Sequence, residues 1–124
     1  LGFLRDASRK TDGTLGYRAR YVLALAQAVA SKALDLEALK QSDLPTPDLR
    51  KRLLAIQGVG GYAAANLLVI LGRYDYVPVD SWAMSQVARE WYGGQRVGEK
   101  EVNAAFQRWG EWKGLAFWCW EWSP

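Results

Sequence analysis

The residues best suited to chemistry form a glycine-rich turn, Gly58, Val59, Gly60, Gly61 and Tyr62. It lies between two stretches whose apolar residues have helical spacing. Glycine lets backbone amides approach a ligand closely, and the first amides of a helix have no acceptor within that helix. The amides of Gly60, Gly61 and Tyr62 begin the second stretch, where the helix dipole favours negative charge. The turn therefore predicts a phosphate site, although a bare Gly-x-Gly is more often only a tight connection.

One carboxylate, Asp80, follows the glycine turn by a single helix. It ends the apolar segment Val77-Pro78-Val79 and precedes another helical stretch, so its ordinary role is that of an N-cap. A carboxylate in this position can also face a sugar whose phosphate the turn holds. Its charge would then stabilise positive charge that develops at the anomeric carbon. We therefore expect Asp80 to be both a cap and a catalytic group.

The composition excludes several classes of chemistry. The 124 residues contain no histidine and a single cysteine, Cys119. Ser-His-Asp triads, histidine metal sites, internal disulfides and four-cysteine iron–sulfur clusters are therefore excluded. Any catalysis must use carboxylates, lysines, tyrosines or the backbone.

The net charge is only +3, but the basic residues are unevenly distributed. Residues 49–74 contain no acid and four basic residues, namely Arg50, Lys51, Arg52 and Arg73. Such a stripe permits nucleic-acid binding without requiring it. No apolar run is long enough to span a membrane, and no secretory leader is recognisable, so we expect a cytoplasmic or nuclear protein.

Hydrophobic spacing predicts an all-α fold without strands. The expected helices cover residues 17–30, 34–39, 47–56, 62–71, 81–91, 99–109 and 115–122. Thr46 is expected to cap the third of them, with Pro47 at its first position. Residues 74–79 are expected to be extended, because Pro78 disfavours helix in the residue before it.

Taken together, Gly58-Val59-Gly60 and Val77-Pro78-Val79-Asp80 resemble the helix-hairpin-helix (HhH-GPD) DNA glycosylase superfamily. Residues 16–22 and the aromatic segment 112–118 resemble further elements of that family. The resemblance implies base excision repair, in which a damaged nucleotide is flipped out and its glycosidic bond is hydrolysed. Asp80 would stabilise the oxocarbenium-like state and position the water. It also implies a helical domain over residues 16–124, preceded by a helix tail and linker in residues 1–15.

Two departures from the family pattern indicate a subfamily. Bifunctional members carry a Schiff-base lysine where this sequence has Tyr62, and the endonuclease III branch carries four cluster cysteines. Both departures favour a monofunctional enzyme similar to 3-methyladenine DNA glycosylase II, which removes alkylated purines. Tyr62, Trp82 and Trp122 are then candidates for an aromatic base pocket, although core packing is the commoner role of a tryptophan.

The resemblance also implies ligands and partners. The main-chain carbonyls of Leu54, Ile56 and Val59 match positions that hold a monovalent cation, Na⁺ or K⁺, against a DNA phosphate. No cofactor and no iron–sulfur cluster are expected, and the partner is double-stranded DNA with a damaged base, bound by a monomer. Two alternatives remain open. One is a non-catalytic helix-hairpin-helix module, and the other is an oxidised-purine glycosylase, which residues 16–22 favour and Tyr62 opposes.

Overall fold

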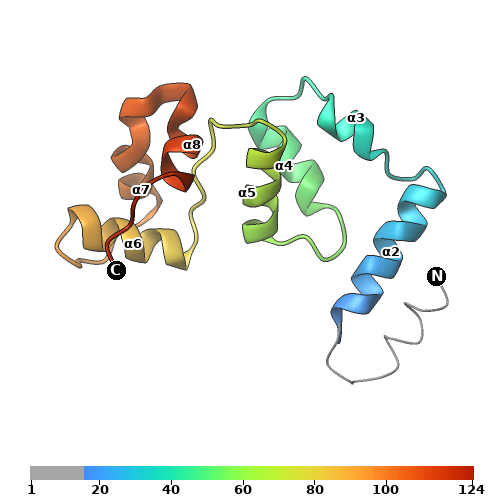
Figure 1. Cartoon of the computed structure of the whole chain (residues 1–124), viewed down its shortest axis with the longest axis horizontal. Coiled ribbons are helices and arrows are strands. Elements are labelled where there is room, and N and C mark those ends of the chain that lie inside the picture. The colour runs from blue at the N-terminus through green and yellow to red at the C-terminus, as the bar shows by residue number, and fades with distance from the viewer. Residues whose placement is uncertain (1–15) are drawn as a thin grey trace.

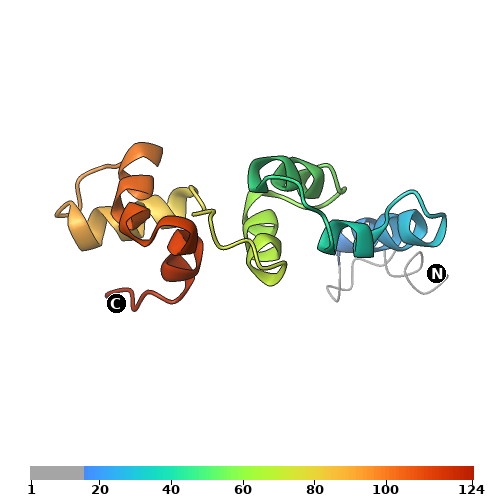
Figure 2. The ribbon, with the colours of Figure 1, turned by 90° about the horizontal axis from the view of Figure 1, so that it is seen from above.

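The computed structural model describes residues 16–124, which fold into a row of helices (Figures 1 and 2). No strand occurs within this range, so the all-α prediction is confirmed. No helix within it is long and apolar enough to cross a membrane. The prediction for residues 1–15 lies outside the described residues. In chain order the helices are α2 (Arg18–Ala30), α3 (Leu36–Lys40), α4 (Thr46–Leu54), α5 (Gly61–Ile70), α6 (Ser81–Trp91), α7 (Glu99–Phe106), the 3₁₀ helix η1 (Gln107–Trp112) and α8 (Lys113–Trp118).

The described helices have two hydrophobic cores. One lies between α3, α4 and α5 and consists of Leu39, Leu49, Leu53, Ala64 and Leu68. The other lies between α6, α7 and α8, where Phe106 and Phe117 are fully buried and tryptophan rings pack around them. The rings of Phe106 and Phe117 meet edge to face, with centroids 5.4 Å apart. Figure 1 shows the α4–α5 hairpin in the middle of the row, beside the group formed by α6, α7 and α8.

The segment between α5 and α6 joins the two cores and is tied to both sides. The Arg73 guanidinium donates hydrogen bonds to two main-chain carbonyls in the connection between α3 and α4. On the other side, the amide of Gly114 in α8 donates to the carbonyl of Tyr74 at 2.6 Å. The segment has no regular secondary structure, as predicted for residues 74–79. Asp80 therefore lies at the end of a backbone segment that is held on both sides.

The predicted cap of α4 is wrong. The helix begins at Thr46 itself, and Pro45 occupies the N-cap position without a side-chain hydrogen bond. The Thr46 hydroxyl instead donates to Asp75 Oδ1 at 2.6 Å. The hydroxyl is thus used to hold the α5–α6 segment against the start of α4, a long-range contact that local spacing does not reveal.

The last two helices end earlier than predicted. α7 ends at Phe106 and continues as η1, which is interrupted at Gly110 with φ 54°. α8 ends at Trp118 rather than at residue 122. Trp120 and Trp122 both pack against Phe106, with ring centroids 6.1 and 6.0 Å away. Residues two apart share a face in an extended chain and not in a helix, so this packing requires the helix to end.

Candidate active site

The glycine turn connects α4 to α5, and its glycines differ in what the fold requires of them. Gly58 has φ +88°, and a Cβ added there would lie 2.7 Å from Cγ of Tyr21 in α2. The fold therefore needs glycine at this position. Gly60 has φ −95°, and a Cβ added there would meet no atom within 4 Å. Internal packing therefore does not explain why position 60 is a glycine.

The first turn of α5 offers unpaired hydrogen-bond donors. Among residues 16–124, no acceptor is found for the amides of Gly60, Gly61 and Tyr62. The first turn also has no acidic residue and no side-chain cap. Free donors at the positive end of a helix dipole are suited to a phosphate group. The free amides predicted from the glycine turn are therefore present, and the phosphate that they would bind stays a prediction.

Arg50 adds positive charge next to this turn. Its guanidinium lies over the ring of Tyr76, 5.3 Å from the centroid. Its Nη2 would lie 3.9 Å from a Cβ added at Gly61, and its Nε is buried without a hydrogen-bond partner. A cation beside the N-terminus of α5 reinforces the positive potential of the helix end, which favours an anion there.

Asp80 is the N-cap of α6, as predicted. Its backbone is extended, with φ −117° and ψ 178°, and its Oδ1 accepts a hydrogen bond from the amide of Ala83 at 2.8 Å. Within residues 16–124, its Oδ2 accepts no hydrogen bond. One carboxylate oxygen therefore fixes the side chain while the other remains available to a ligand.

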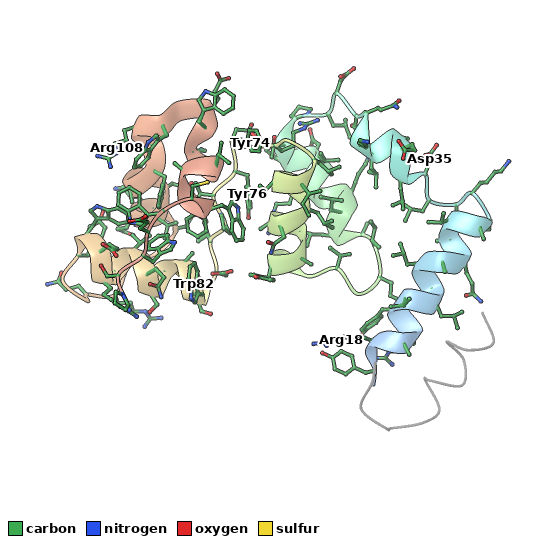
Figure 3. All side chains as sticks on the ribbon, in the orientation of Figure 1. Arg18, Asp35, Tyr74, Tyr76, Trp82 and Arg108 are labelled. Carbon is green, nitrogen blue, oxygen red and sulfur yellow. The ribbon has the colours of Figure 1, made fainter. Side chains whose placement is uncertain are left out.

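Asp80 also lines a pocket of about 200 Å³. Its walls come from the start of α5, the end of the α5–α6 segment with the start of α6, and α8. Aromatic rings dominate the lining, which is formed by Tyr62, Pro78, Asp80, Trp82, Phe117 and Trp118. Figure 3 shows Trp82 at the beginning of α6, below the segment that connects α5 to α6. A pocket lined by aromatic rings and one carboxylate is suited to an aromatic base attached to a sugar.

The pocket brings together three residues that the sequence singles out, namely Tyr62, Asp80 and Trp82. Tyr62 and Trp82 are 68% and 50% exposed, so neither serves mainly as core packing. No lysine is among the lining residues. Tyr62, at the position where bifunctional family members carry their lysine, is therefore the group that faces the pocket from α5.

Trp122, which the sequence analysis also assigns to the pocket, does not line it. Its ring centroid lies 5.6 Å from that of Trp82 and 5.3 Å from that of Phe117, so it packs against two residues that line the pocket. Because α8 ends at Trp118, the residues that follow it pack against the aromatic core and do not continue along the pocket. Phe117 and Trp118 line the pocket without having been predicted to, although both belong to the aromatic segment 112–118 that resembles the family.

Two of the three carbonyls predicted to hold a cation have no hydrogen-bond donor in the described residues. Among the described residues, the carbonyls of Leu54 and Val59 accept no hydrogen bond, and that of Ile56 accepts one, from the amide of Val59 at 3.0 Å. Free carbonyl oxygens are suitable ligands for a hard cation. Side chains do not offer an alternative, because residues 16–124 contain no cluster of acidic or cysteine ligands. The ion itself stays a prediction.

No protein-family model matches the chain, and no protein of curated function is similar to it in sequence. Solved structures are similar. MBOgg1 in complex with a low-affinity DNA ligand has 25% identity and a TM-score of 0.69, over 92% of this chain and 38% of that one. The 8-oxoguanine glycosylase/lyase of Clostridium acetobutylicum, bound to DNA with cytosine opposite 8-oxoguanine, has 24% identity and a TM-score of 0.65, over 84% and 36%.

The apo form of the Clostridium acetobutylicum enzyme has 25% identity and a TM-score of 0.63, over 83% of this chain and 36% of that one. The chain thus spans less than two fifths of the length of these structures. None of them is a 3-methyladenine DNA glycosylase, so the comparisons support the superfamily and not the subfamily expected from the sequence. Residues 16–124 have the fold of the helix-hairpin-helix DNA glycosylase superfamily.

Proposed function

We propose that this chain carries the active site of a base-excision-repair DNA glycosylase. The observation that carries the proposal is that Asp80 lies in an aromatic pocket with one oxygen fixed by a helix amide and the other free. Tyr62 connects this pocket to the hairpin, because it lines the pocket and also begins α5 beside the free amides of Gly60 and Gly61. All these groups come from one chain, so a monomer acting on double-stranded DNA suffices.

The geometry supports a hydrolytic mechanism. The hairpin amides hold a phosphate of the damaged strand. The carbonyls of Leu54, Ile56 and Val59 would hold a monovalent cation, which would supply charge compensation for that phosphate. The flipped base enters between the aromatic side chains. As the bond between the base and C1′ breaks, the base leaves with the electron pair and takes up a proton. Asp80 stabilises the positive charge on the sugar, and a water molecule adds hydroxide to C1′ while releasing a proton.

Oxidised purines are the first substrate class to test. The Clostridium acetobutylicum protein with this fold is an 8-oxoguanine glycosylase/lyase, and its similarity covers most of the chain. The aromatic lining keeps alkylated purines as a second class, because electron-rich rings attract cationic bases. We expect a panel of duplexes with oxidised, alkylated and undamaged purines to show excision of the oxidised base. Excision of alkylated bases alone would restore the subfamily favoured by the sequence.

We further propose that the enzyme is monofunctional and leaves the DNA strand uncut. Strand cleavage through a Schiff base needs an amine that attacks the sugar, and Tyr62 cannot form an imine. Borohydride trapping during active excision is expected to yield no covalent protein–DNA adduct. An adduct would show that a lysine acts as nucleophile, and the water-based mechanism would then have to be abandoned.

A further inference from the structure

Gly114, in the first turn of α8, packs directly against the backbone that leads to Asp80. It is buried, and its amide donates to the carbonyl of Tyr74 at 2.6 Å. A Cβ added at Gly114 would lie 2.7 Å from the carbonyl oxygen of Tyr74 and still closer to that of Tyr76. Real Cβ atoms do not approach main-chain oxygens so closely, so any other residue must push α8 away from the segment.

The segment cannot easily yield to such a push. Asp75, which lies between Tyr74 and Tyr76, accepts a hydrogen bond from the hydroxyl of Thr46 in α4 at 2.6 Å. Tyr76 packs against the leucine core on its other side and lies under the guanidinium of Arg50. Figure 3 shows Tyr74 and Tyr76 on the connecting segment between α8 and α5. A side chain at position 114 would therefore displace α8 rather than the segment.

A displacement of α8 would change the shape of the base pocket. Phe117 and Trp118 follow Gly114 by three and four residues, so all three share one face of α8. Phe117 and Trp118 form the wall of the pocket that belongs to α8, while Pro78 and Asp80 belong to the wall formed by the α5–α6 segment. Pro78 lies only two residues beyond Tyr76, whose carbonyl Gly114 contacts. The Gly114 contact therefore fixes the distance between the two walls.

We propose that Gly114 is a positioning residue that sets the width of the base pocket and, through it, the choice of base. This inference rests on the proposed glycosylase function. Gly114→Ala in the full-length protein is expected to lower single-turnover excision of the preferred lesion on the order of 10²-fold, the scale of a misplacement by about 1 Å. Purines enlarged by an extra ring should lose less, so discrimination between small and large bases should fall. Affinity for DNA with an abasic site should not change, because no base enters the pocket.

Gly98→Ala is the matched control. Gly98 has φ −120°, and its added Cβ would meet Glu101 Oε2 at 3.5 Å, an ordinary contact outside the base pocket. We expect this variant to keep the discrimination of the unaltered protein. Equal discrimination by Gly114→Ala and the unaltered protein would overturn the inference alone. Failure of the unaltered protein to release any base would overturn the proposed function, and with it the role of Gly114 in base choice.

Hydrogen exchange tests the contact without any substitution, which matters if Gly114→Ala fails to fold. Gly114 is the second residue of α8, so its amide has no acceptor within that helix. Only the carbonyl of Tyr74 accepts from it in the described chain. Slow exchange of this amide in the unaltered protein is the expected result. Exchange as fast as that of an exposed first-turn amide would show that α8 is not held on the segment, and the inference would be wrong.

Discussion

Asp80→Asn is expected to abolish base release while DNA binding persists. The carboxamide oxygen can still accept the hydrogen bond from the amide of Ala83, so the cap of α6 is kept. What is lost is the negative charge that we propose stabilises the sugar cation. Removing a preorganised electrostatic group of this kind lowers rates on the order of 10²- to 10³-fold. Single-turnover excision and fluorescence anisotropy, measured on the same lesion duplex, separate the two effects.

Asp35→Asn provides the control for capping. Asp35 is the N-cap of α3 and accepts from the amide of Ala38 at 3.0 Å, the same arrangement as at Asp80. It lies on the far side of α4 and α5 from Trp82 (Figure 3). Excision by the Asp35 variant should therefore be normal. If both variants lost activity equally, or if Asp80→Asn excised at nearly the normal rate, Asp80 would be a cap and not a catalytic group.

Gly60→Val is expected to weaken binding to every duplex alike. The extended backbone of Gly60 is one that valine adopts readily, and a Cβ added there meets no atom within 4 Å, so the fold should survive. The methyl groups of valine would occupy the space through which a phosphate reaches the amides of Gly60, Gly61 and Tyr62. Each lost hydrogen bond to a charged group costs about 1.5–3 kcal/mol, which corresponds to at least a tenfold loss of affinity. Titrations at several salt concentrations measure this loss.

Gly58→Ala separates the structural glycine from the binding glycine. At φ +88° and against the ring of Tyr21, alanine should lower the free energy of unfolding, whereas Gly60→Val should leave it unchanged. Thermal unfolding of the two variants measures this difference. A Gly60→Val protein that binds DNA as tightly as the unaltered protein would show that the turn only connects two helices.

The parts of the site that were predictable from the sequence depend on neighbouring residues. The glycine turn and the cap by Asp80 each carry their signal within a few positions, because glycines and N-cap residues act on the adjacent backbone. Their meeting with Tyr62 and Trp82 in one pocket depends on how two helices pack. The resemblance to a known family supplied that step, and spacing alone did not.

The parts that were not predictable depend on long-range packing. The hydrogen bond from Thr46 to Asp75 spans the two ends of the α4–α5 hairpin, so a sequence that favours a cap gives no sign of it. The sequence predicts a helix as far as Trp122, yet Trp120 and Trp122 both pack against Phe106. In the sequence, Gly114 is only a glycine within a helix. Its contact with the α5–α6 segment is visible only in the structure.

Detection of the released base is the most direct test of the proposed glycosylase activity. The full-length protein would be incubated with a duplex that contains 8-oxoguanine opposite cytosine, and the released small molecules would be identified by mass spectrometry. We expect free 8-oxoguanine together with an intact, alkali-labile abasic strand. Tight binding of duplexes that carry oxidised or alkylated purines, without release of a base from any of them, would contradict the proposed activity and leave a hairpin module that only holds DNA.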